Sequence, residues 1–370
     1  MSNSNLIIIN GLNSRSGGGL VIFSEFLRQR SSFDNKIKYI IFIPNGFKCE
    51  TLDKNTNVIF IEFPNFINNF ILLFFYYYLL LPIFFIFFKP KFILNFGDIV
   101  IPYITKQIYF FDWAFALSDK TSISFNLNSI TRQLKILQIR RNIINIKKII
   151  CQTTLIRDEL KLKLLIPNNN LIVLPTPPLI YNDLDKTKIL NYKSFNSSTP
   201  LILFYPTSLS FHKNIAFLFN LARIINDLKL PVKFKITTNK KDLEKIYPDL
   251  KLCNSIELCG FLSHKEVLQQ LQDCHFLFFP SLLESYGLPL VEAMSLTKPI
   301  LVSDLDYAKV LCDDSADYFN PYEVNSAIEI IKNILTGNFD HKVKCTKLKQ
   351  RFNMIPSWDF FTKELLDYKY

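Results

Sequence analysis

Two glutamates eight residues apart flank a Gly-x-Pro turn in the C-terminal half of the 370-residue sequence. Glu284 follows an apolar run, His275 to Phe279, that predicts a short strand, and Glu292 lies one turn into a predicted helix. Between them, Gly287 frees the backbone, and Pro289 suits the first turn of a helix. One carboxylate therefore stands ahead of the helix start and a second one behind it.

Backbone amides at this helix start are the second chemical feature of the segment. The first N–H groups of a helix have no partner within the helix, so they attract anions. Here they belong to Ser285, Tyr286, Gly287 and Leu288. A diphosphate needs such amides, and sugar hydroxyls suit the flanking carboxylates. Two surface glutamates on an amphipathic helix would show the same spacing, but the strand, the turn and a following Lys-Pro-Ile run favour the binding site.

A lysine and a pair of glycines offer two further phosphate contacts. Lys213 stands after an apolar strand predicted over Leu201 to Tyr205, at the start of a predicted helix, where its charge can offset that of a departing phosphate. Gly18 and Gly19 end a polar loop behind the first predicted strand, and such bare backbone permits close approach of a ligand. A solvated lysine and an ordinary turn are the alternatives. The glycines lack the G-x-G-x-x-G spacing, which argues against a nicotinamide enzyme.

The composition is that of a basic globular protein. Hydrophobic residues make up 49% of the chain and charged residues 20%, which excludes a disordered chain. The seven cysteines show no C-x2-C pair, so neither a zinc site nor a disulfide framework is expected, and a reducing compartment fits. The start of the chain has no signal-peptide pattern. The net charge of +11 would suit nucleic acid, but no nucleic-acid-binding motif is present, so an anionic membrane surface fits better.

The run from Phe70 to Phe88 holds 19 residues without a charge. As a helix it would span roughly 28 Å at about 1.5 Å per residue, close to the thickness of a bilayer core. A true span would split the surrounding α/β domain across the membrane. The expectation is therefore a helix partly buried in the domain and partly dipped into the membrane interface, with a span as the alternative. The basic stretch Arg132 to Lys148 fits a solvated helix face or a membrane-facing one equally well.

Strands alternate with helices along the whole chain, which predicts an α/β fold with two doubly wound, mainly parallel sheets. The predicted parts are an N-terminal domain (1–175), a linker (176–199), a C-terminal domain (200–355) and a final helix (356–370). The remaining strands are expected at Leu6 to Asn10, Tyr39 to Ile43, Val58 to Glu62, Phe92 to Asn95, Gln107 to Phe111, Lys148 to Cys151, Leu171 to Leu174, Val232 to Thr238, Ser255 to Leu258 and Pro299 to Ser303.

The segment around Glu284 and Glu292 resembles the E-x7-E signature of glycosyltransferase family 4. The resemblance is strong from about Phe204 to Leu366 and weaker in the first 175 residues. It implies a GT-B architecture, in which two Rossmann-like domains face a cleft. It also implies retaining transfer of a sugar from a nucleotide-sugar donor, with no cofactor or metal ion required. Residues 356–359 resemble the start of the family's last helix, which in related proteins crosses back to the N-terminal domain.

The resemblance also implies roles for individual residues. Glu292 matches the glutamate that binds the donor ribose, Glu284 the one near the transferred sugar, and Lys213 the lysine that contacts the diphosphate. Glu284 is expected to orient and stabilise the donor sugar, whereas a double displacement would make it a nucleophile. The base pocket is expected to use backbone near Phe261 and Leu262.

Three positions of the N-terminal half and of the Lys213 loop complete the comparison. Gly18 and Gly19 resemble the family's glycine loop. Ser208 stands where many members have an arginine, so one phosphate contact is missing or comes from elsewhere. Asp112 stands where relatives often have a histidine facing the acceptor. It fits a base, an acceptor-hydroxyl ligand or a residue that caps a strand end.

The hypothesis is a cytoplasmic glycosyltransferase, attached peripherally to the inner face of the cell membrane. It would extend a lipid-linked surface polysaccharide or lipopolysaccharide-type glycan, and nucleic acid is not an expected partner. Two alternatives remain. One is a nucleotide-sugar 2-epimerase of the same fold, and the other is a non-catalytic scaffold subunit that binds sugar nucleotides.

Overall fold

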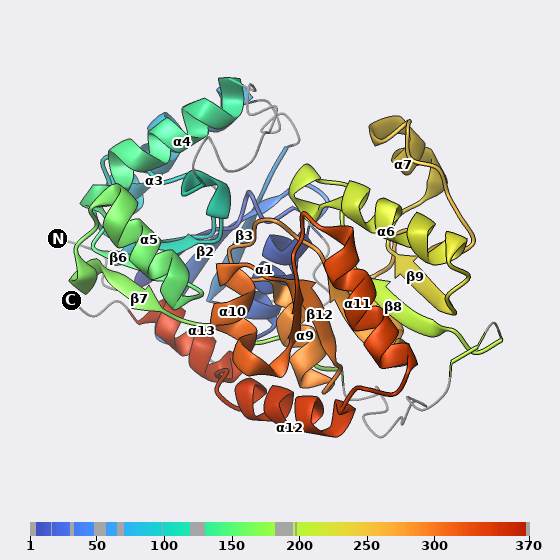
Figure 1. The fold of residues 1–370 in the computed structure, drawn as a ribbon. Helices are drawn as coiled ribbons and strands as arrows, with labels where there is room; N and C mark the ends of the chain where they lie inside the picture. Colours follow the sequence, from blue (N-terminus) through green and yellow to red (C-terminus); the bar gives the residue numbers. More distant parts are fainter. Residues whose placement is uncertain are drawn as a thin grey trace. The chain divides into compact units, whose positions relative to one another are not determined.

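The computed structural model of the chain describes residues 5–15, 17–29, 33–47, 57–64, 70–97, 99–118, 130–181, 195–196 and 198–367. Contacts within the chain divide it into two compact units (Figure 1). The first unit consists of residues 1–177 together with 356–370, and the second of residues 178–355. Each unit has its own sheet, so each is an α/β body in its own right.

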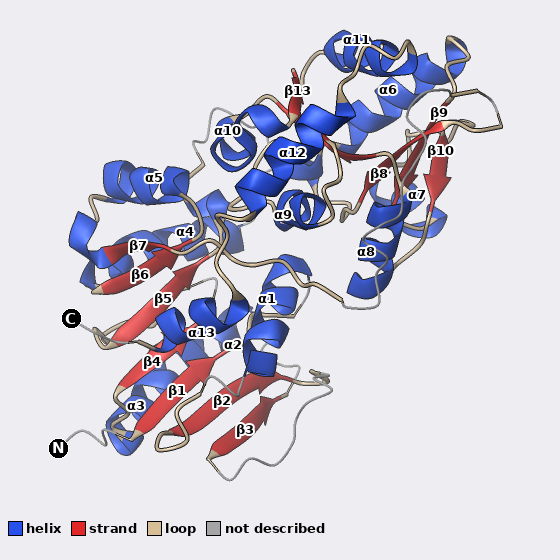
Figure 2. Ribbon diagram, turned by 90° about the horizontal axis from the view of Figure 1, so that it is seen from below, coloured by secondary structure: helices blue, strands red, loops and turns tan. Residues whose placement is uncertain are grey.

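The first unit contains a seven-stranded parallel sheet in the order β3-β2-β1-β4-β5-β6-β7 (Figure 2). All six neighbouring pairs are parallel. The strands are β1 (Leu6–Asn10), β2 (Lys38–Pro44), β3 (Val58–Phe63), β4 (Phe92–Asn95), β5 (Gln107–Phe111), β6 (Lys148–Cys151) and β7 (Leu171–Val173). β1, β4, β5 and β6 are buried along their whole length, as expected for a sheet covered on both faces.

Helices cover both faces of this sheet. They are α1 (Gly17–Arg28), α2 (Phe70–Phe75), α3 (Leu81–Phe88), α4 (Ile130–Asn142), α5 (Thr154–Leu164) and α13 (Trp358–Leu366). Alternate residues of β2 show the division. Ile41 packs in one cluster with Phe26 of α1 and Phe361 of α13. Phe42 points the other way, where its ring lies 5.4 Å from that of Phe84 in α3.

The aromatic segment forms one continuous helical stretch of three parts. α2 and α3 are joined by a π-helical turn, Tyr76–Leu80, which lies just before Pro82. A proline lacks the N–H that the turn before it would use and crowds the carbonyl four residues back, so the wider turn accommodates Pro82. Lys89 ends the stretch in the left-handed conformation, with a φ of 46°.

Only one side of the stretch is buried. Leu73, Tyr76, Tyr77 and Leu81 are buried. The exposed apolar face, defined here by residues three or four positions apart, consists of Leu72, Phe75, Leu79, Ile83 and Ile86. In the described part of the chain, no helix combines the length and apolar character needed to cross a membrane.

The last helix, α13, is part of the first unit. Phe361 and Leu365 are fully buried in the cluster that also holds α1, and Phe361 makes an edge contact with Phe110 of β5. Lys148, buried at the start of β6, donates from Nζ to the carbonyl oxygens of Glu364 and Asp367. It therefore stabilises the last carbonyls of α13 and does not belong to a solvated basic face.

The second unit has a six-stranded parallel sheet in the order β10-β9-β8-β11-β12-β13. Its strands are β8 (Leu201–Tyr205), β9 (Val232–Ile236), β10 (Ile256–Leu258), β11 (Phe276–Phe279), β12 (Ile300–Ser303) and β13 (Asp317–Phe319). Its helices are α6 (Ile215–Asp227), α7 (Lys240–Ile246), α8 (His264–Asp273), α9 (Leu288–Ser295), α10 (Asp306–Cys312), α11 (Val324–Leu335) and α12 (His341–Phe352). Stacked rings of Phe217, Phe278 and Phe319 join α6, β11 and β13.

The predicted fold class is confirmed, since both sheets are parallel and doubly wound. Two elements differ from the sequence-based expectation. β13 was not expected, because it is three residues long and begins with a charged aspartate. α1 begins at Gly17, so Gly18 and Gly19 lie in the first turn of a helix and do not end a loop as expected.

We expect Phe361→Ala to lower the free energy of unfolding of the first unit by roughly 3–5 kcal/mol, because it empties a fully buried aromatic site. The matched control is Phe360→Ala, at the neighbouring position with 52% of the side chain exposed, which should cost less than about 0.5 kcal/mol. Denaturant unfolding followed by circular dichroism measures both. Equal losses in the two variants would show that α13 is not anchored through Phe361.

Candidate functional site

The second sheet reverses its strand order between β8 and β11. From β8 the chain proceeds outward to β9 and β10, and then it returns to β11 and continues to β12 and β13 on the other side. Ligands of open α/β sheets bind beyond the carboxyl ends of the strands at such a reversal. Lys213 follows β8, and Glu284 follows β11. The topology therefore brings these two predicted site residues to the same place.

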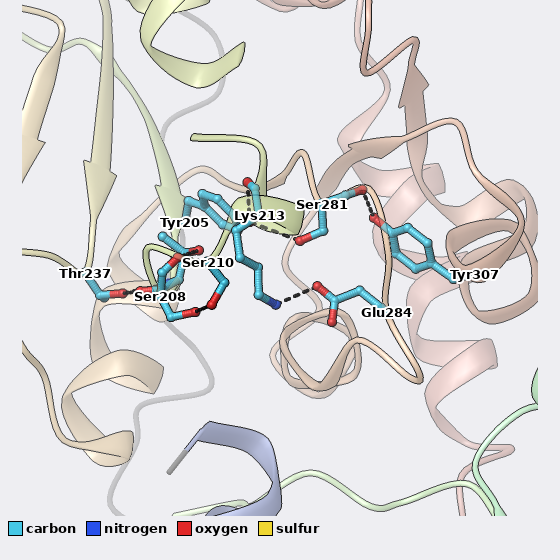
Figure 3. A network of polar contacts seen from close by, with 9 residues as sticks. Tyr205, Ser208, Ser210, Lys213, Thr237, Ser281, Glu284 and Tyr307 are labelled. Atoms are coloured by element: carbon cyan, nitrogen blue, oxygen red, sulfur yellow. Dashed lines mark hydrogen bonds and ion pairs between the residues drawn. The ribbon is translucent and has the colours of Figure 1, made fainter. Parts of the chain in front are cut away.

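Lys213 and Glu284 form a direct ion pair (Figure 3). The distance from Lys213 Nζ to Glu284 Oε1 is 2.6 Å, and only 16% and 13% of the two side chains are exposed. The ammonium group also lies 5.5 Å from the ring centroid of Phe279, the last residue of β11. A partly desolvated pair such as this one is held more firmly than a surface pair, and it places a cation and an acceptor side by side.

Two buried phenols fix the loops that carry the pair. Tyr205 Oη donates to the Lys213 carbonyl oxygen over 2.9 Å and lies 3.0 Å from Ser281 Oγ. Tyr307 Oη donates to the Ser281 carbonyl oxygen over 2.8 Å (Figure 3). Burial raises the pKa of both Tyr205 and Tyr307, so both hydroxyls keep their protons and remain donors. The loops after β8 and β11 are thus tied together behind the ion pair.

Hydroxyl groups occupy the loop that leads to Lys213. Ser208 Oγ and Ser210 Oγ are 3.1 Å apart. Thr237 Oγ1 accepts from the Thr207 backbone N–H over 2.7 Å and donates to the Thr207 carbonyl oxygen over 2.9 Å. Ser208 is the position at which the sequence resemblance leads one to expect an arginine. The loop here offers neutral hydroxyls, which can donate to a phosphate but bring no charge.

The turn before α9 has the predicted geometry. Gly287 adopts a left-handed conformation with φ of 85° and caps the helix that begins at Leu288. A side chain there would be strained by this φ and would meet Leu290 Cδ1 at 3.0 Å. Pro289 lies in the first turn. Tyr286 is buried with 2% exposure, so its side chain belongs to the core, and only its backbone can serve an anion at this helix start.

Glu292 lies in the body of α9 and is almost fully buried. Its Oε1 is 2.6 Å from Nε2 of His264, and 4% of the glutamate side chain is exposed. His264 is the first residue of α8. No motif or spacing pairs these two residues, which lie 28 positions apart along the chain. A local signal does place His264 at a helix start, because Ser263 and Glu266 form a capping box.

The loop expected to line a base pocket joins β10 to α8. It begins at Gly260, which has a φ of 73° and open space around its α-carbon on the side-chain side. Phe261 is 74% exposed, and Leu262 is half-buried. Among the described residues, no group of three or more His, Cys, Asp or Glu side chains is placed to hold a metal ion.

Gly18, Gly19 and Asp112 lie in the first unit. Gly18 is exposed, and a methyl group at its α-carbon would meet no atom within 4 Å. At Gly19 the same methyl group would lie 3.5 Å from Asp112 Oδ2. The carboxyl end of β5 therefore brings Asp112 next to the first turn of α1.

The second unit is similar in sequence to a known protein family. Residues 187–351 match the family described as "Glycosyl transferases group 1". The O-antigen chain mannosyltransferase RfbU of Salmonella typhimurium is 27% identical over 158 residues, which cover 42% of this chain and 43% of that protein. The phosphatidylinositol N-acetylglucosaminyltransferase gpi3 subunit of Schizosaccharomyces pombe is 24% identical over 32% of this chain and 26% of that protein. The match thus spans less than half of each relative.

Solved structures resemble the whole chain at low sequence identity. WaaG, a glycosyltransferase involved in lipopolysaccharide biosynthesis, aligns with a TM-score of 0.71 at 14% identity, covering 97% of this chain and 98% of that one. HepE of Anabaena, solved with UDP and glucose, aligns with a TM-score of 0.66 at 14% identity, covering 98% of each chain. Identities this low establish the fold alone, and that fold is GT-B, as expected from the sequence.

We expect Tyr205→Phe to lower the free energy of unfolding of the second unit by about 1–3 kcal/mol. The substitution removes the buried hydroxyl that hydrogen-bonds to the Lys213 carbonyl oxygen and to Ser281 Oγ. The control is Tyr322→Phe, at a position with 66% exposure, which should be neutral. Thermal unfolding of both variants is the measurement. A Tyr205 variant as stable as the control would mean that this hydroxyl does not hold the two loops together.

Proposed function

We propose that this chain, whose residues 187–351 match the family "Glycosyl transferases group 1", is a retaining glycosyltransferase that uses a nucleotide-sugar donor. The observation that carries the proposal is the Lys213–Glu284 pair, held at the strand-order reversal of the second sheet. In a nucleotide sugar, the charged diphosphate is joined directly to a sugar that carries hydroxyl groups. A cation next to a carboxylate suits this junction, since the cation can contact the diphosphate and the carboxylate can accept from the hydroxyls.

The charges of the site define how the donor would bind. Lys213 and Glu284 together carry no net charge when paired, so the ammonium group alone does not offset a diphosphate. The amides at the start of α9 and the hydroxyls of Ser208 and Ser210 supply the remaining donors. In this arrangement Lys213 contacts the diphosphate and Glu284 accepts from the hydroxyls of the donor sugar.

The reaction that fits these groups is a front-face displacement. An acceptor hydroxyl oxygen forms a bond to the anomeric carbon of the donor sugar while the bond from that carbon to the diphosphate oxygen breaks. The departing phosphate accepts the hydroxyl proton, and Lys213 stabilises the charge that develops on it. Glu284 orients the sugar. A role as nucleophile suits Glu284 less, because a carboxylate that accepts a 2.6 Å hydrogen bond from an ammonium group is a weaker nucleophile than a free carboxylate.

The proposed acceptor is a surface glycan carried on a lipid. The names of two similar proteins support it, since one is an O-antigen chain mannosyltransferase and another is involved in lipopolysaccharide biosynthesis. Asp112, beside the helix start at Gly19, is the proposed acceptor-side residue. Donor breakdown without any acceptor would favour an epimerase, and nucleotide binding without turnover would favour a scaffold subunit.

We expect Lys213→Ala to lower transfer by about 10²-fold or more, the scale on which one preorganised charge contact acts. A thermal-shift screen with UDP, GDP, ADP and their sugars first identifies the donor, because a ligand that binds the native state raises the unfolding temperature. Release of nucleoside diphosphate in the presence of a membrane glycolipid extract then measures turnover. Lys240→Ala, at a side chain with 69% exposure, is the control. Unchanged turnover of the Lys213 variant at saturating donor would refute the assignment.

The exposed apolar face supports peripheral attachment to a membrane. Its residues Leu72, Phe75, Leu79, Ile83 and Ile86 are 36%, 51%, 44%, 37% and 66% exposed, and Phe87 beside it is 80% exposed. Single exposed apolar residues are ordinary, but a row of them along one helix face indicates a contact surface. A helix of this kind lies in the interface with its apolar face among the acyl chains.

Lysines at the amino ends of the strands of the first sheet would add an electrostatic contribution to membrane binding. Lys38 begins β2, and Lys91, Lys106 and Lys147 immediately precede β4, β5 and β6; all four are exposed. Lys89 ends the aromatic helix and is exposed as well. These lysines would attract the anionic lipids of the cytoplasmic leaflet. We therefore propose that the protein acts at the inner face of the cell membrane.

We expect replacement of Phe75, Leu79, Ile83 and Ile86 by glutamine to abolish flotation with anionic phosphatidylglycerol vesicles while the fold persists. The control replaces Leu137 of α4, Leu162 of α5 and Leu165, the residue that follows α5; these are 61%, 75% and 77% exposed. Phe84 is left intact, since its ring packs on Phe42 of the core. High salt should release part of the wild-type protein, because it screens the lysines. Equal flotation of both variants would remove the membrane assignment and leave the transferase proposal standing.

A further inference from the structure

The carboxylate of Glu292 is held by a histidine from another helix. His264 Nε2 lies 2.6 Å from Glu292 Oε1. Only 4% of the glutamate side chain and 18% of the histidine side chain are exposed. A carboxylate this deeply buried requires a hydrogen-bond donor, because burial without one costs several kcal/mol. In the described part of the chain, His264 is the side chain that meets this requirement.

The imidazole is held in place on two sides. His264 is the first residue of α8, and the reciprocal capping box of Ser263 and Glu266 fixes where that helix begins. The ring of Tyr181 lies beside the imidazole, with a distance of 6.0 Å between ring centroids. The capping box and the ring of Tyr181 thus define where the imidazole lies.

The histidine contacts one oxygen of the Glu292 carboxylate, Oε1, and does not contact the other, Oε2. No hydrogen bond joins Glu292 Oε2 to any residue that the structure describes, and Nδ1 of His264 has no partner among the same residues. With Nε2 donating to the carboxylate, Oε2 keeps its capacity to accept. A ribose presents two neighbouring hydroxyls, and a carboxylate with one fixed and one available oxygen suits such a diol.

We infer that His264 is a positioning residue for the donor nucleoside, which fixes the Glu292 carboxylate so that its second oxygen accepts from a ribose hydroxyl. The inference rests on the proposed function, because it takes the donor to be a nucleotide sugar. His264 acts through Glu292, and the transferred sugar lies at Glu284. Its loss should therefore weaken nucleotide binding and leave the chemical step unaffected.

The test compares His264→Ala, His264→Gln and Glu292→Ala by calorimetric titration with UDP, GDP and ADP and with the 2′-deoxy form of whichever nucleotide binds. His264→Ala should raise the dissociation constant of the ribonucleotide about 10-fold or more, on the scale of a hydrogen bond to a charged group. It should also abolish the preference for ribose over deoxyribose, and Glu292→Ala should do the same. His264→Gln keeps an N–H donor and should restore part of both.

The matched control is His341→Ala. His341 is also the first residue of a helix, α12, and it follows a capping aspartate, Asp340. This variant should bind nucleotide as the wild type does. Turnover at saturating donor should stay within about twofold of wild type in His264→Ala, so the change falls on KM and not on kcat.

The outcomes distinguish a failure of the role of His264 from a failure of the proposed function. Tighter nucleotide binding by His264→Ala would mean that the histidine competes with the ribose for Glu292, which overturns the inference. An unchanged ribose preference together with a lower unfolding temperature would assign His264 to stability alone, which overturns it as well. A wild-type protein that binds none of the three nucleotides would refute the proposed function itself. A wild type that binds, with a His264→Ala variant that binds equally, would refute only the role of His264.

Discussion

The pairing of β8 with β11 is the constraint on which the candidate site depends. Because these strands are neighbours at the point where the sheet order reverses, the loops after them leave the sheet side by side. Lys213 comes from one loop and Glu284 from the other, and the hydroxyl of Tyr205 joins the two behind the pair. The ion pair is therefore a product of topology and of one buried hydrogen-bond network. Neither loop alone could hold its charged group at this degree of burial.

The charge balance explains why the site needs more than its lysine. A diphosphate brings a larger negative charge than one ammonium group offsets, and Glu284 already engages that group. Helix-start amides contribute partial positive charge without a counter-ion, so in the proposed donor complex the turn at Gly287 would share the diphosphate charge with Lys213. Ser208 stands where the family resemblance leads one to expect an arginine, so in the proposed donor complex the diphosphate would depend more on backbone and hydroxyl donors. The two glutamates have different partners, since Glu284 pairs with Lys213 and Glu292 pairs with His264.

Most of the fold could be predicted from local sequence signals. The contacts between residues distant in the sequence could not. Apolar runs located every strand of both sheets except β13, whose three residues are too few and too polar to stand out. The strand, turn and helix around Gly287 fixed the places of Glu284 and Glu292. The contact of His264 with Glu292 joins two helices, and that of Lys148 with α13 joins segments more than two hundred residues apart. No periodicity or spacing in the sequence encodes such pairs.

In the aromatic segment, the sequence does not show which side chains are buried. Every residue from Phe70 to Phe88 is uncharged, so composition cannot distinguish a residue that packs on β2 from one that faces outward. The structure separates them, because Phe84 contacts Phe42 whereas Phe75 is half exposed. The π-helical turn before Pro82 adds one residue to that turn, and the exposed positions still fall on one face across it. Leaving apolar surface in water costs about 25 cal/mol per Å², so a face this rich in Phe, Leu and Ile is stabilised when a second apolar phase covers it. A membrane supplies that phase without requiring a shape-matched partner.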